Sequence, residues 1–296
     1  MKKLLIILLL FSPLLHYAQE RTDKKLQKKI EALIKDYHGV IGIYVKELKK
    51  DRVVRIAQDT IFPTASIVKV PIMLGLMDKM HKGELAYDSL FTYKDSLYYA
   101  GSDILGSFKE NATISLKKLI MLMLTTSDNT ASLWLQSIAG TGTRINELLA
   151  GFGFENTRVN SRTPGREGFR AIYQWGMTTP YEMGTLLEKV YKHQLFSPAI
   201  CDRMLRCLGR NFWDENEAIS QIPATIEVFS KNGCVDASRS EVMIVNAPHR
   251  PYIFCIFTKK NNDISWGRDN EAWALARKIS KLLWEYYEPR YGGSFK

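Results

Sequence analysis

Beyond its first residues, the sequence lacks any hydrophobic run long enough to cross a membrane. The apolar run Leu4–Phe11 follows Lys2 and Lys3, and no later stretch approaches about 20 apolar residues, the length that a spanning helix needs. Two lysines, a short apolar run and a small residue at Ala18 are typical of a signal peptide over residues 1–18. No cysteine lies near this cleavage point, so we expect no lipid anchor. We therefore expect an exported chain, periplasmic or extracellular, without a stable membrane anchor.

Cysteine and histidine are scarce, with 4 and 5 copies in 296 residues. Cys201 and Cys207 fall on one expected helix, where a spacing of six residues corresponds to a rise of about 9 Å, too far for an easy disulfide. Nothing in the sequence places Cys234 beside Cys255, so we expect mostly free thiols. No spacing of histidines or cysteines matches a metal site. We therefore predict neither a metal nor a cofactor.

Other missing patterns exclude further classes of protein. There is no basic stripe and no nucleic-acid-binding motif, although removing residues 1–18 leaves a net charge of +8 in place of +10. This surplus either favours anionic envelope polymers and carboxylate substrates or simply keeps the chain soluble, and we prefer solubility. No G-x-S-x-G segment is present, which disfavours a Ser-His-Asp hydrolase. Without repeats or linkers, residues 19–296 are expected to form one catalytic domain, and we expect a monomer.

Apolar periodicity predicts an α+β fold. Helices are expected at Lys24–Tyr37, Ser66–Met80, Ser115–Leu124, Asn129–Ile138, Arg144–Leu149, Pro180–Tyr191, Pro198–Leu208 and about Asn270–Tyr286. Strands are expected at Val40–Glu47, Arg52–Ala57, Thr225–Lys231, Glu241–Asn246 and Tyr252–Lys259. Because the strands lie near both chain ends, we predict one antiparallel sheet flanked by helices, with an all-helical lobe inserted at about 66–209. The α/β part would then comprise about 24–65 and 210–290, with the active site where sheet and lobe meet.

The first chemical motif is Ser66-Ile67-Val68-Lys69. Positions i and i+3 share a helix face, so Ser66 and Lys69 can touch, and a serine needs such a base before it becomes a nucleophile. The backbone N–H groups of a helix start also favour negative charge beside Ser66. The pattern is short, and an isolated copy is more often a helix-capping serine followed by a surface lysine.

Two further motifs follow in order, Ser127-Asp128-Asn129 and Lys231-Asn232-Gly233. Taken singly, the first could be a plain helix cap and the second a hairpin turn. Taken together with the first motif, they point to one active site.

With these three motifs the chain resembles the serine β-lactamase and penicillin-binding-protein superfamily, and class A β-lactamases in particular. The family signatures are S-x-x-K, S-D-N and K-T-G. The flanking segments Phe62–Pro71, Ser127–Ala131 and Thr178-Thr179-Pro180 are similar as well, and the resemblance covers roughly residues 25–290.

The resemblance implies a role for each motif residue. Ser66 would attack a strained carbonyl, Lys69 would accept its proton, and Ser127 would relay a proton to the departing nitrogen. Asn129 would bind a substrate amide and hold Lys69, and Lys231 would supply positive charge near a substrate carboxylate.

Around the third motif, Asn232 and Gly233 would complete the substrate-binding edge. The oxyanion hole would consist of the backbone N–H groups of Ser66 and Cys234. Arg239 is a further candidate for binding a substrate carboxylate, and Tyr98 and Tyr99 could line the cleft, although surface packing is at least as good an account of the two tyrosines.

The sequence departs from the family pattern at two places. Asn232 replaces the usual threonine or serine, so a carboxylate would be bound with altered geometry. Laying Thr157-Arg158-Val159 on the start of the family's loop puts Thr163 where the glutamate that activates the deacylating water should be. Glu167 is the nearest carboxylate that could substitute, and it could equally be a solvated loop charge.

Three functions stay open on these residues. The first is a β-lactamase-like serine hydrolase that opens β-lactam amides through an acyl-Ser66 intermediate. The second is a penicillin-binding type of peptidoglycan peptidase or esterase, and the third is a non-hydrolytic binder that stays acylated. The expected partner is in each case a small β-lactam or a peptidoglycan-like acyl substrate.

Overall fold

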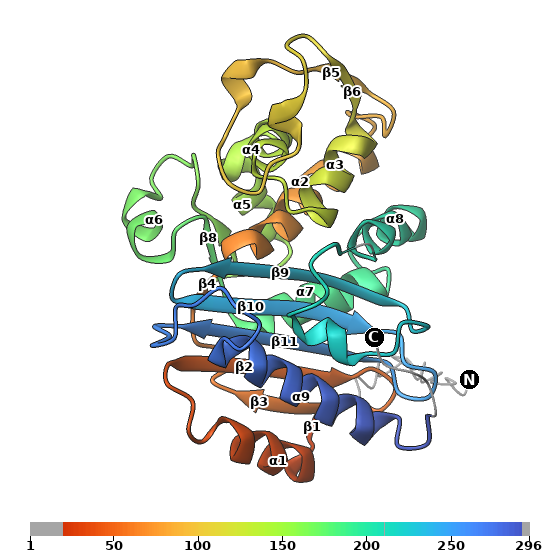
Figure 1. The fold of residues 1–296 in the computed structure, drawn as a ribbon. Coiled ribbons are helices and arrows are strands. Elements are labelled where there is room, and N and C mark those ends of the chain that lie inside the picture. The colour runs from red at the N-terminus through yellow and green to blue at the C-terminus, as the bar shows by residue number, and fades with distance from the viewer. Residues whose placement is uncertain (1–19, 210, 292–296) are drawn as a thin grey trace, which may run out of the picture.

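The computed structural model describes residues 20–209 and 211–291, so the expected signal peptide lies outside the described residues. A six-stranded sheet with the strand order β1-β3-β2-β11-β10-β9 forms its centre (Figure 1). Its strands are β1 (Arg21–Thr22), β2 (Val40–Glu47), β3 (Arg52–Ile56), β9 (Val228–Val235), β10 (Ser238–Val245) and β11 (Tyr252–Lys259). All neighbours pair antiparallel except β1 and β3. Both chain ends supply strands, so the predicted α+β sheet is confirmed.

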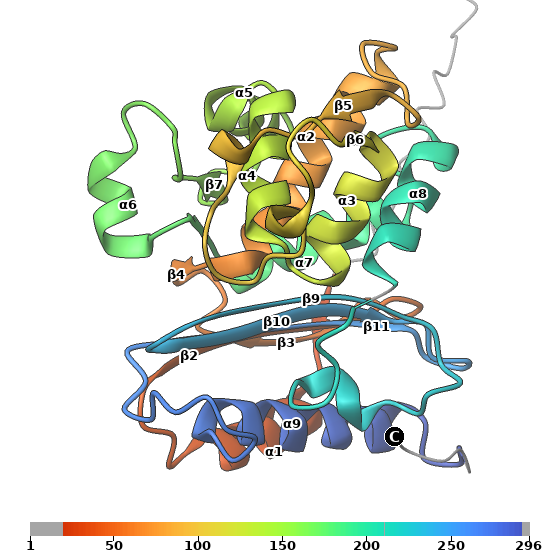
Figure 2. The same cartoon turned by 45° about the horizontal axis from the view of Figure 1, so that its top comes forward.

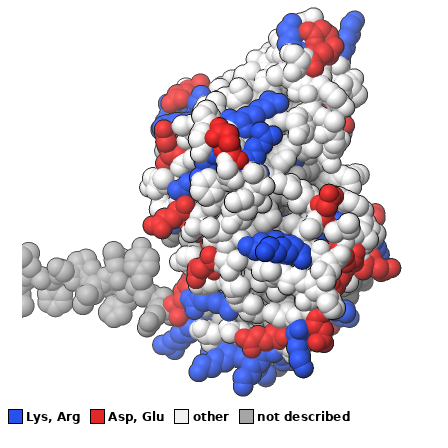
Figure 3. All heavy atoms as spheres, turned by 90° about the vertical axis from the view of Figure 1, so that its left-hand side faces the viewer, with Lys and Arg blue, Asp and Glu red and all other residues white. Residues whose placement is uncertain are grey.

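Helices α1 (Lys24–Ile34) and α9 (Glu271–Tyr287) cover one face of the sheet (Figures 1 and 2). Asp23 and Asn270 cap these helices by accepting hydrogen bonds from backbone N–H groups in the first turns. The apolar faces of both helices pack on alternate residues of the strands and form the smaller of two hydrophobic cores. On the outside, α1 carries four lysines, and Figure 3 shows basic side chains gathered at this end of the molecule with acidic ones among them.

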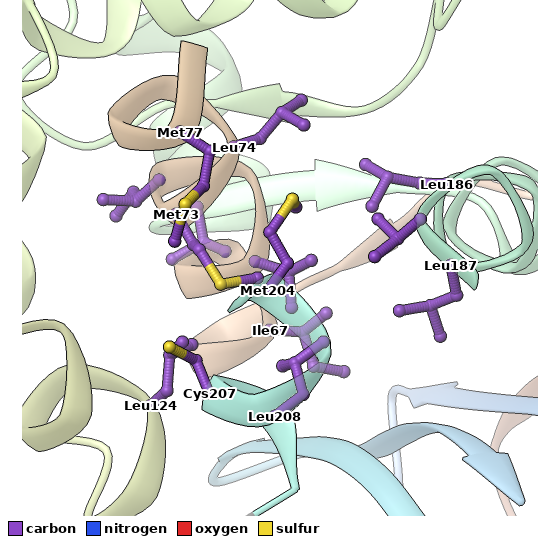
Figure 4. Packing of buried hydrophobic residues seen from close by; sticks show 14 of the residues in the cluster. Ile67, Met73, Leu74, Met77, Leu124, Leu186, Leu187, Met204, Cys207 and Leu208 are labelled. Atoms are coloured by element: carbon purple, nitrogen blue, oxygen red, sulfur yellow. The ribbon is translucent and has the colours of Figure 1, made fainter. Parts of the chain in front are cut away.

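The opposite face of the sheet supports the helical lobe, which contains the larger core. Its helices are α2 (Lys69–His81), α3 (Leu116–Thr125), α4 (Asn129–Ile138), α5 (Thr141–Gly151), α7 (Pro180–Tyr191) and α8 (Pro198–Leu208). Helix α2 runs through the middle of this lobe and is buried from Lys69 to Asp78. Figure 4 shows Met73 of α2 near Met204 of α8, and Ile67 near Leu208 of α8. The start of α2, which contains Lys69, is therefore held by packing on nearly every side.

Short elements connect the lobe to the sheet. The hairpin β5 (Leu90–Thr92) and β6 (Thr113–Ser115) lies at the far end of the lobe. Strand β8 (Gly176–Thr178) pairs with both β4 (Phe62–Pro63) and β7 (Arg158–Val159), and a short helix α6 (Glu167–Tyr173) precedes it. This three-stranded ribbon brings the segment 157–178 beside the residues that lead into Ser66. Among the described residues, no helix combines the length and apolarity that a membrane crossing needs.

Two predicted boundaries around the site are wrong. The helix expected from Ser66 begins instead as a 3-10 turn, Ala65–Val68, and becomes α-helical only at Lys69. The strand expected at Thr225–Lys231 runs from Val228 to Val235, because Ile226 first closes a turn onto Pro223. The third motif therefore lies inside an edge strand that pairs with β10 along its whole length, and not in a turn.

Candidate active site

Ser66 lies in the tight 3-10 turn that ends the β4 segment. Ala65 adopts a left-handed backbone with φ of +43°, and Thr64 donates from its backbone N–H to the Gly176 carbonyl at 3.0 Å. Ile67 and Val68 are fully buried in the lobe core, whereas Ser66 is only half-buried. The turn thus presents the hydroxyl of Ser66 at the surface of a rigidly packed segment.

Lys69 lies one turn further on and is fully buried. Its Nζ contacts Ser66 Oγ at 3.1 Å, Ser127 Oγ at 2.9 Å, the Ser127 carbonyl at 2.6 Å and Asn129 Oδ1 at 2.9 Å. The structure therefore brings together four of the residues that the sequence singled out. None of the hydrogen bonds described for Lys69 or Ser66 goes to a carboxylate.

The surroundings of Lys69 favour its neutral form. Burial first, and the positive charge of Lys231 second, hold the pKa of Lys69 well below its ordinary value, against the opposing charge of Asp128. A neutral amine 3.1 Å from a serine hydroxyl has the geometry and the lone pair that proton abstraction requires.

The second motif is a strained turn that hydrogen bonds to the Asp128 carboxylate hold in place. Ser127 has φ of +61° and is buried. Asp128 caps α4 by accepting from Ala131 N at 2.7 Å, and its other oxygen accepts from the backbone of Ile104 and Leu105 at 2.6 and 2.8 Å. These bonds hold Ser127 and Asn129 against Lys69, so Asp128 positions the motif without touching Ser66 or Lys69.

The third motif faces the nucleophile from the sheet edge. A Cβ added to Gly233 would lie 2.5 Å from the Thr64 carbonyl and 3.0 Å from the backbone nitrogens of Ser66 and Ile67. Only glycine allows β9 to approach the turn this closely. Because β9 is an edge strand, alternate backbone N–H groups point away from the sheet and have no strand partner. Cys234, whose N–H is a candidate for the oxyanion hole, lies on this strand.

Lys231 and Asn232 are both buried in this edge strand. Lys231 Nζ donates to the carbonyl and the Oδ1 of Asn232 at 2.8 and 3.1 Å, and burial lowers its pKa to about 8. Asn232 Nδ2 in turn donates to Glu217 Oε1 at 3.0 Å. Sequence inspection missed Glu217, because no motif marks it and the chain folds back over 15 residues to reach Asn232.

Arg239 does not offer its guanidinium to the site, contrary to the expectation of a carboxylate contact. The side chain is 1% exposed and lies 4.3 Å from the centre of the Trp266 ring. It donates to the backbone carbonyls of Val235, Asp236, Ser238, Ile264 and Ser265. Its two terminal nitrogens thus tie the β9–β10 hairpin to the loop before α9, while its buried Nε has no hydrogen-bond partner among the described residues.

The loop residues Thr163 and Glu167 lie apart from the bonded cluster. Thr163 donates to the Ser161 carbonyl at 2.9 Å and packs so tightly on α5 that a Cβ on Gly142 would lie 1.8 Å from its Oγ1. Glu167 is exposed at the start of α6, where it accepts from Gly165 N at 3.2 Å. No contact described for either residue reaches Ser66 or Lys69.

An aromatic pair that the sequence did not identify in full lies beside Lys69. The Trp175 ring centre is 6.0 Å from Lys69 Nζ, and Tyr99 packs edge-on against Trp175 with ring centres 5.4 Å apart. Tyr98 instead lies over Gly106. Trp175 immediately precedes β8, and the pairing of β8 with β4 brings Trp175 to the site. A strand of three residues is too short to show a periodic pattern in the sequence, so Trp175 was not predicted.

Glu182 holds the loop that begins at residue 155. It is the third residue of α7, after the Thr179 cap and Pro180, and it accepts from the backbone N–H groups of Glu155, Asn156 and Thr157. The spacing Thr179–Glu182 is that of a capping box, which is the signal that could have identified it.

Cys201, Cys207, Cys234 and Cys255 are free thiols. Within residues 20–209 and 211–291, no group of three or more His, Cys, Asp or Glu side chains could hold a metal ion.

A serine and a buried lysine on one helical turn face a second serine and the edge strand of an antiparallel sheet. A member of the Beta-lactamase enzyme family with this arrangement is a β-lactamase- or penicillin-binding-protein-like serine hydrolase acting on β-lactam amides. The chain belongs to the Beta-lactamase enzyme family, which matches residues 25–287. It is 24% identical over 298 residues to the β-lactamase VEB-1 of Pseudomonas aeruginosa, covering 97% of this chain and 98% of that protein. A β-lactamase of Bacteroides uniformis is 24% identical over 292 residues, covering 94% and 97% of the two chains.

Solved structures share the same fold. PBP-A superimposes with a TM-score of 0.80 at 23% identity, covering 91% of this chain and 98% of that chain, and a point mutant of PBP-A was solved as an acyl-enzyme complex with penicillin G. A class A β-lactamase from Bacteroides cellulosilyticus gives a TM-score of 0.78 at 23% identity, covering 90% and 98%. At this identity the structural comparison establishes the fold.

Proposed function

We propose that the protein opens β-lactam amides through a covalent acyl-Ser66 intermediate and releases the acyl group slowly. The observation that carries the first half is the 3.1 Å contact between Ser66 Oγ and the buried Lys69 Nζ. Neutral Lys69 takes the hydroxyl proton as Ser66 Oγ bonds to the carbonyl carbon. The resulting oxyanion is stabilised by the backbone N–H groups of Ser66 and Cys234.

The leaving nitrogen then needs a proton. Ser127 Oγ lies 2.9 Å from Lys69 Nζ, so the proton taken from Ser66 passes through Ser127 to the nitrogen as the C–N bond breaks. Lys69 returns to its neutral form, and the acyl group remains on Ser66. Asn129 holds Lys69 through its Oδ1 and keeps its Nδ2 for a substrate amide.

Release is the slow half in this proposal. Hydrolysis of the ester needs a base that activates water, and the described bonds of Ser66 and Lys69 include no carboxylate. Thr163 is bound to a backbone carbonyl, and Glu167 is exposed on α6. A threonine hydroxyl cannot serve as a base near neutral pH.

The test mixes the purified mature protein with a penicillin and with a chromogenic cephalosporin. Mass spectrometry should find one adduct on Ser66, absent from Ser66→Ala, and absorbance should show a burst of about one equivalent followed by slow turnover. No adduct and no turnover would overturn the proposal. Fast turnover without a burst would retain the hydrolase and refute slow release.

We also propose that the chain is exported and cleaved near Ala18. The support is the sequence of residues 1–18, with two lysines before a short apolar run. Fractionation of expressing cells and the intact mass of the product test this directly. A full-length protein in the cytoplasm would contradict it.

A further inference from the structure

The loop between β7 and α6, together with the first turn of α6, forms a small pocket outside the bonded cluster of Ser66 and Lys69. Figures 1 and 2 show this segment projecting from the side of the molecule. The pocket has a volume of about 250 Å³ and is lined by Asn160, Arg162, Thr163, Pro164, Glu167 and Arg170. Pockets for drug-sized ligands measure about 300–1,000 Å³, so this one has room for a single small group.

The buried amide of Asn160 gives the pocket a hydrogen-bond donor without a partner. Asn160 is 1% exposed, and its Oδ1 accepts from Nε and Nη2 of Arg166 at 3.0 and 2.9 Å. These two bonds fix which way the amide points, because a guanidinium can only donate. Nδ2 is therefore a donor, and it has no hydrogen-bond partner among the described residues. Buried polar groups are normally paired, so a donor in a pocket wall is suited to a ligand that brings an acceptor.

The charged side chains of the pocket leave a surplus of positive charge. Arg162 and Arg170 are both exposed, and among the described residues neither guanidinium forms an ion pair or a hydrogen bond. Glu167 is the acidic residue of the lining, and it forms no ion pair with either arginine in the described part of the chain. Arg166, which is bound to Asn160, adds a third cation. Three guanidiniums therefore act against one carboxylate, and their combined field favours an anion.

The free donors of the pocket suit an anion with several oxygens. A guanidinium can donate to two oxygens of a carboxylate or a phosphate at once, and such charge-assisted bonds are stronger than bonds between neutral groups. Nδ2 of Asn160 can donate to the same anion. The hydroxyl of Thr163 already donates to the Ser161 carbonyl at 2.9 Å, so Thr163 shapes the wall. A cation in the pocket would instead meet two guanidiniums and an unpaired N–H group.

We propose that this pocket is a binding site for a small oxyanion, a carboxylate or a phosphate group, held by Arg162, Arg170 and Nδ2 of Asn160. The group is supplied either by a free small anion or by a polymer that carries many such groups. The site lies next to the segment that leads to Trp175, since the backbone N–H of Asn160 donates to the Trp175 carbonyl at 2.8 Å. It does not use Ser66, so it is separate from the proposed acylation.

The experiment titrates the purified mature protein with inorganic phosphate, and separately with acetate, while NMR follows the backbone amide signals. Ionic strength is held constant, because exposed charges also respond to salt. We expect saturable shifts of the signals from residues 160–170 with at least one of the two anions. Saturation by neither anion would overturn the inference. Shifts confined to residues 231–234 would place the anion at the third motif and would overturn it as well.

Three substitutions test the three donors. Arg162→Gln and Arg170→Gln each remove one guanidinium from an exposed position, where folding is not at risk, and each should weaken binding about tenfold. Asn160→Asp keeps an oxygen for Arg166 and replaces the Nδ2 donor with a second oxygen, so saturable binding should be lost. Binding by Asn160→Asp at the wild-type affinity would refute the role of Nδ2 and the site with it.

Arg290→Gln is the matched control for the two arginine variants. Arg290 is exposed and follows α9, which covers the opposite face of the sheet from the lobe. It should bind phosphate as the wild-type protein does. If this control weakens binding as much as Arg162→Gln, the anion only screens surface charge, and the inference is wrong.

Glu167→Gln tests the sign of the field in the pocket. Loss of the opposing carboxylate should strengthen phosphate binding about threefold, as expected for one exposed charge. Weaker binding in this variant would contradict a pocket in which Glu167 opposes the anion.

Soluble polyphosphate distinguishes the two sources of the oxyanion. A higher affinity per phosphate group than that of inorganic phosphate, lost in Arg162→Gln, would identify a polymer as the ligand. Equal affinity per phosphate group would identify a small free anion. Either result supports the oxyanion site.

The outcomes also separate this site from the proposed function. Ser66→Ala should bind phosphate as the wild-type protein does, because no described contact of the pocket includes Ser66. A protein that binds phosphate and is not acylated by penicillin would refute the proposed function and retain this site. A protein that is acylated and shows no saturable shifts would retain the function and refute the site.

Discussion

The side-chain nitrogen of Lys69 lies 6.0 Å from the centre of the Trp175 ring, so an aromatic side chain covers this side of the amine. Trp175 in turn packs against Tyr99. Such a cover removes water from Lys69, which favours its neutral form, and it places no carboxylate beside Ser66. In the proposed function, this cover would help Lys69 to take the proton of Ser66.

A first prediction concerns this cover. Trp175→Ala lets water reach Lys69, and because burial is the largest cause of its lowered pKa, the pKa should rise. A lysine with a higher pKa is neutral only at higher pH, so the acid limb of the acylation rate should move upward by about one pH unit. The measurement is the rate of adduct formation between pH 5 and 9.

Ile172→Ala is the matched control for this variant. Ile172 lies on α6 and is 71% exposed, so its removal should leave the pH profile where it is. An unchanged profile in Trp175→Ala would show that other groups keep Lys69 dry.

A second prediction concerns the approach of β9 to the nucleophile turn. In Gly233→Ala the new Cβ would lie 2.5 Å from the Thr64 carbonyl and must push the strand away from Ser66. Acylation should fall by more than about 100-fold, because a misplacement of about 1 Å is enough to lose that much rate. Circular dichroism should show a folded protein. Gly168→Ala, where a Cβ meets open space, should acylate normally; a normal rate in Gly233→Ala would refute the close fit.

The fold class, and most of the residues that contact Lys69, could be predicted from the sequence. Ser66 and Lys69 could be paired because positions three apart share a helix face, and the antiparallel sheet followed from strands near both chain ends. Trp175 and Glu217 could not be found in this way. Their contacts depend on a three-residue strand and on an irregular segment, in which no periodic pattern records the pairing. The backbone contacts of Arg239 could not be predicted for a related reason, since alternation along a strand does not tell which loop will cover the side chain.

A third prediction concerns release. Glu167 is exposed and accepts a hydrogen bond only from the nearby Gly165 N–H among the bonds described for it. Glu167→Gln should therefore change the deacylation rate of the Ser66 adduct by less than about twofold, since water screens an exposed charge that has no described contact with Ser66 or Lys69. The measurement is the decay of the adduct after removal of free penicillin. A tenfold slower decay would identify Glu167 as the missing base and would require α6 to close over the site.

The last prediction concerns stability and uses the buried Glu241, whose pKa is raised from 4.5 to about 8 by burial first and by Glu217 second. Between these values the folded state holds a proton that the unfolded state has released, so stability falls as the pH rises through this window. Glu241→Gln removes this titration, although it also loses one of two acceptors for the backbone of Ala218 and Ile219.

The free energy of unfolding of the wild-type protein should therefore fall by a few kcal/mol more than that of the variant between pH 5 and pH 8, as measured by urea unfolding. Readings stop at pH 8 because Lys231, whose pKa is lowered to about 8, adds the opposite slope above it. Parallel curves for the two proteins would mean that Glu241 is already ionised in the folded state, and burial would then not raise its pKa.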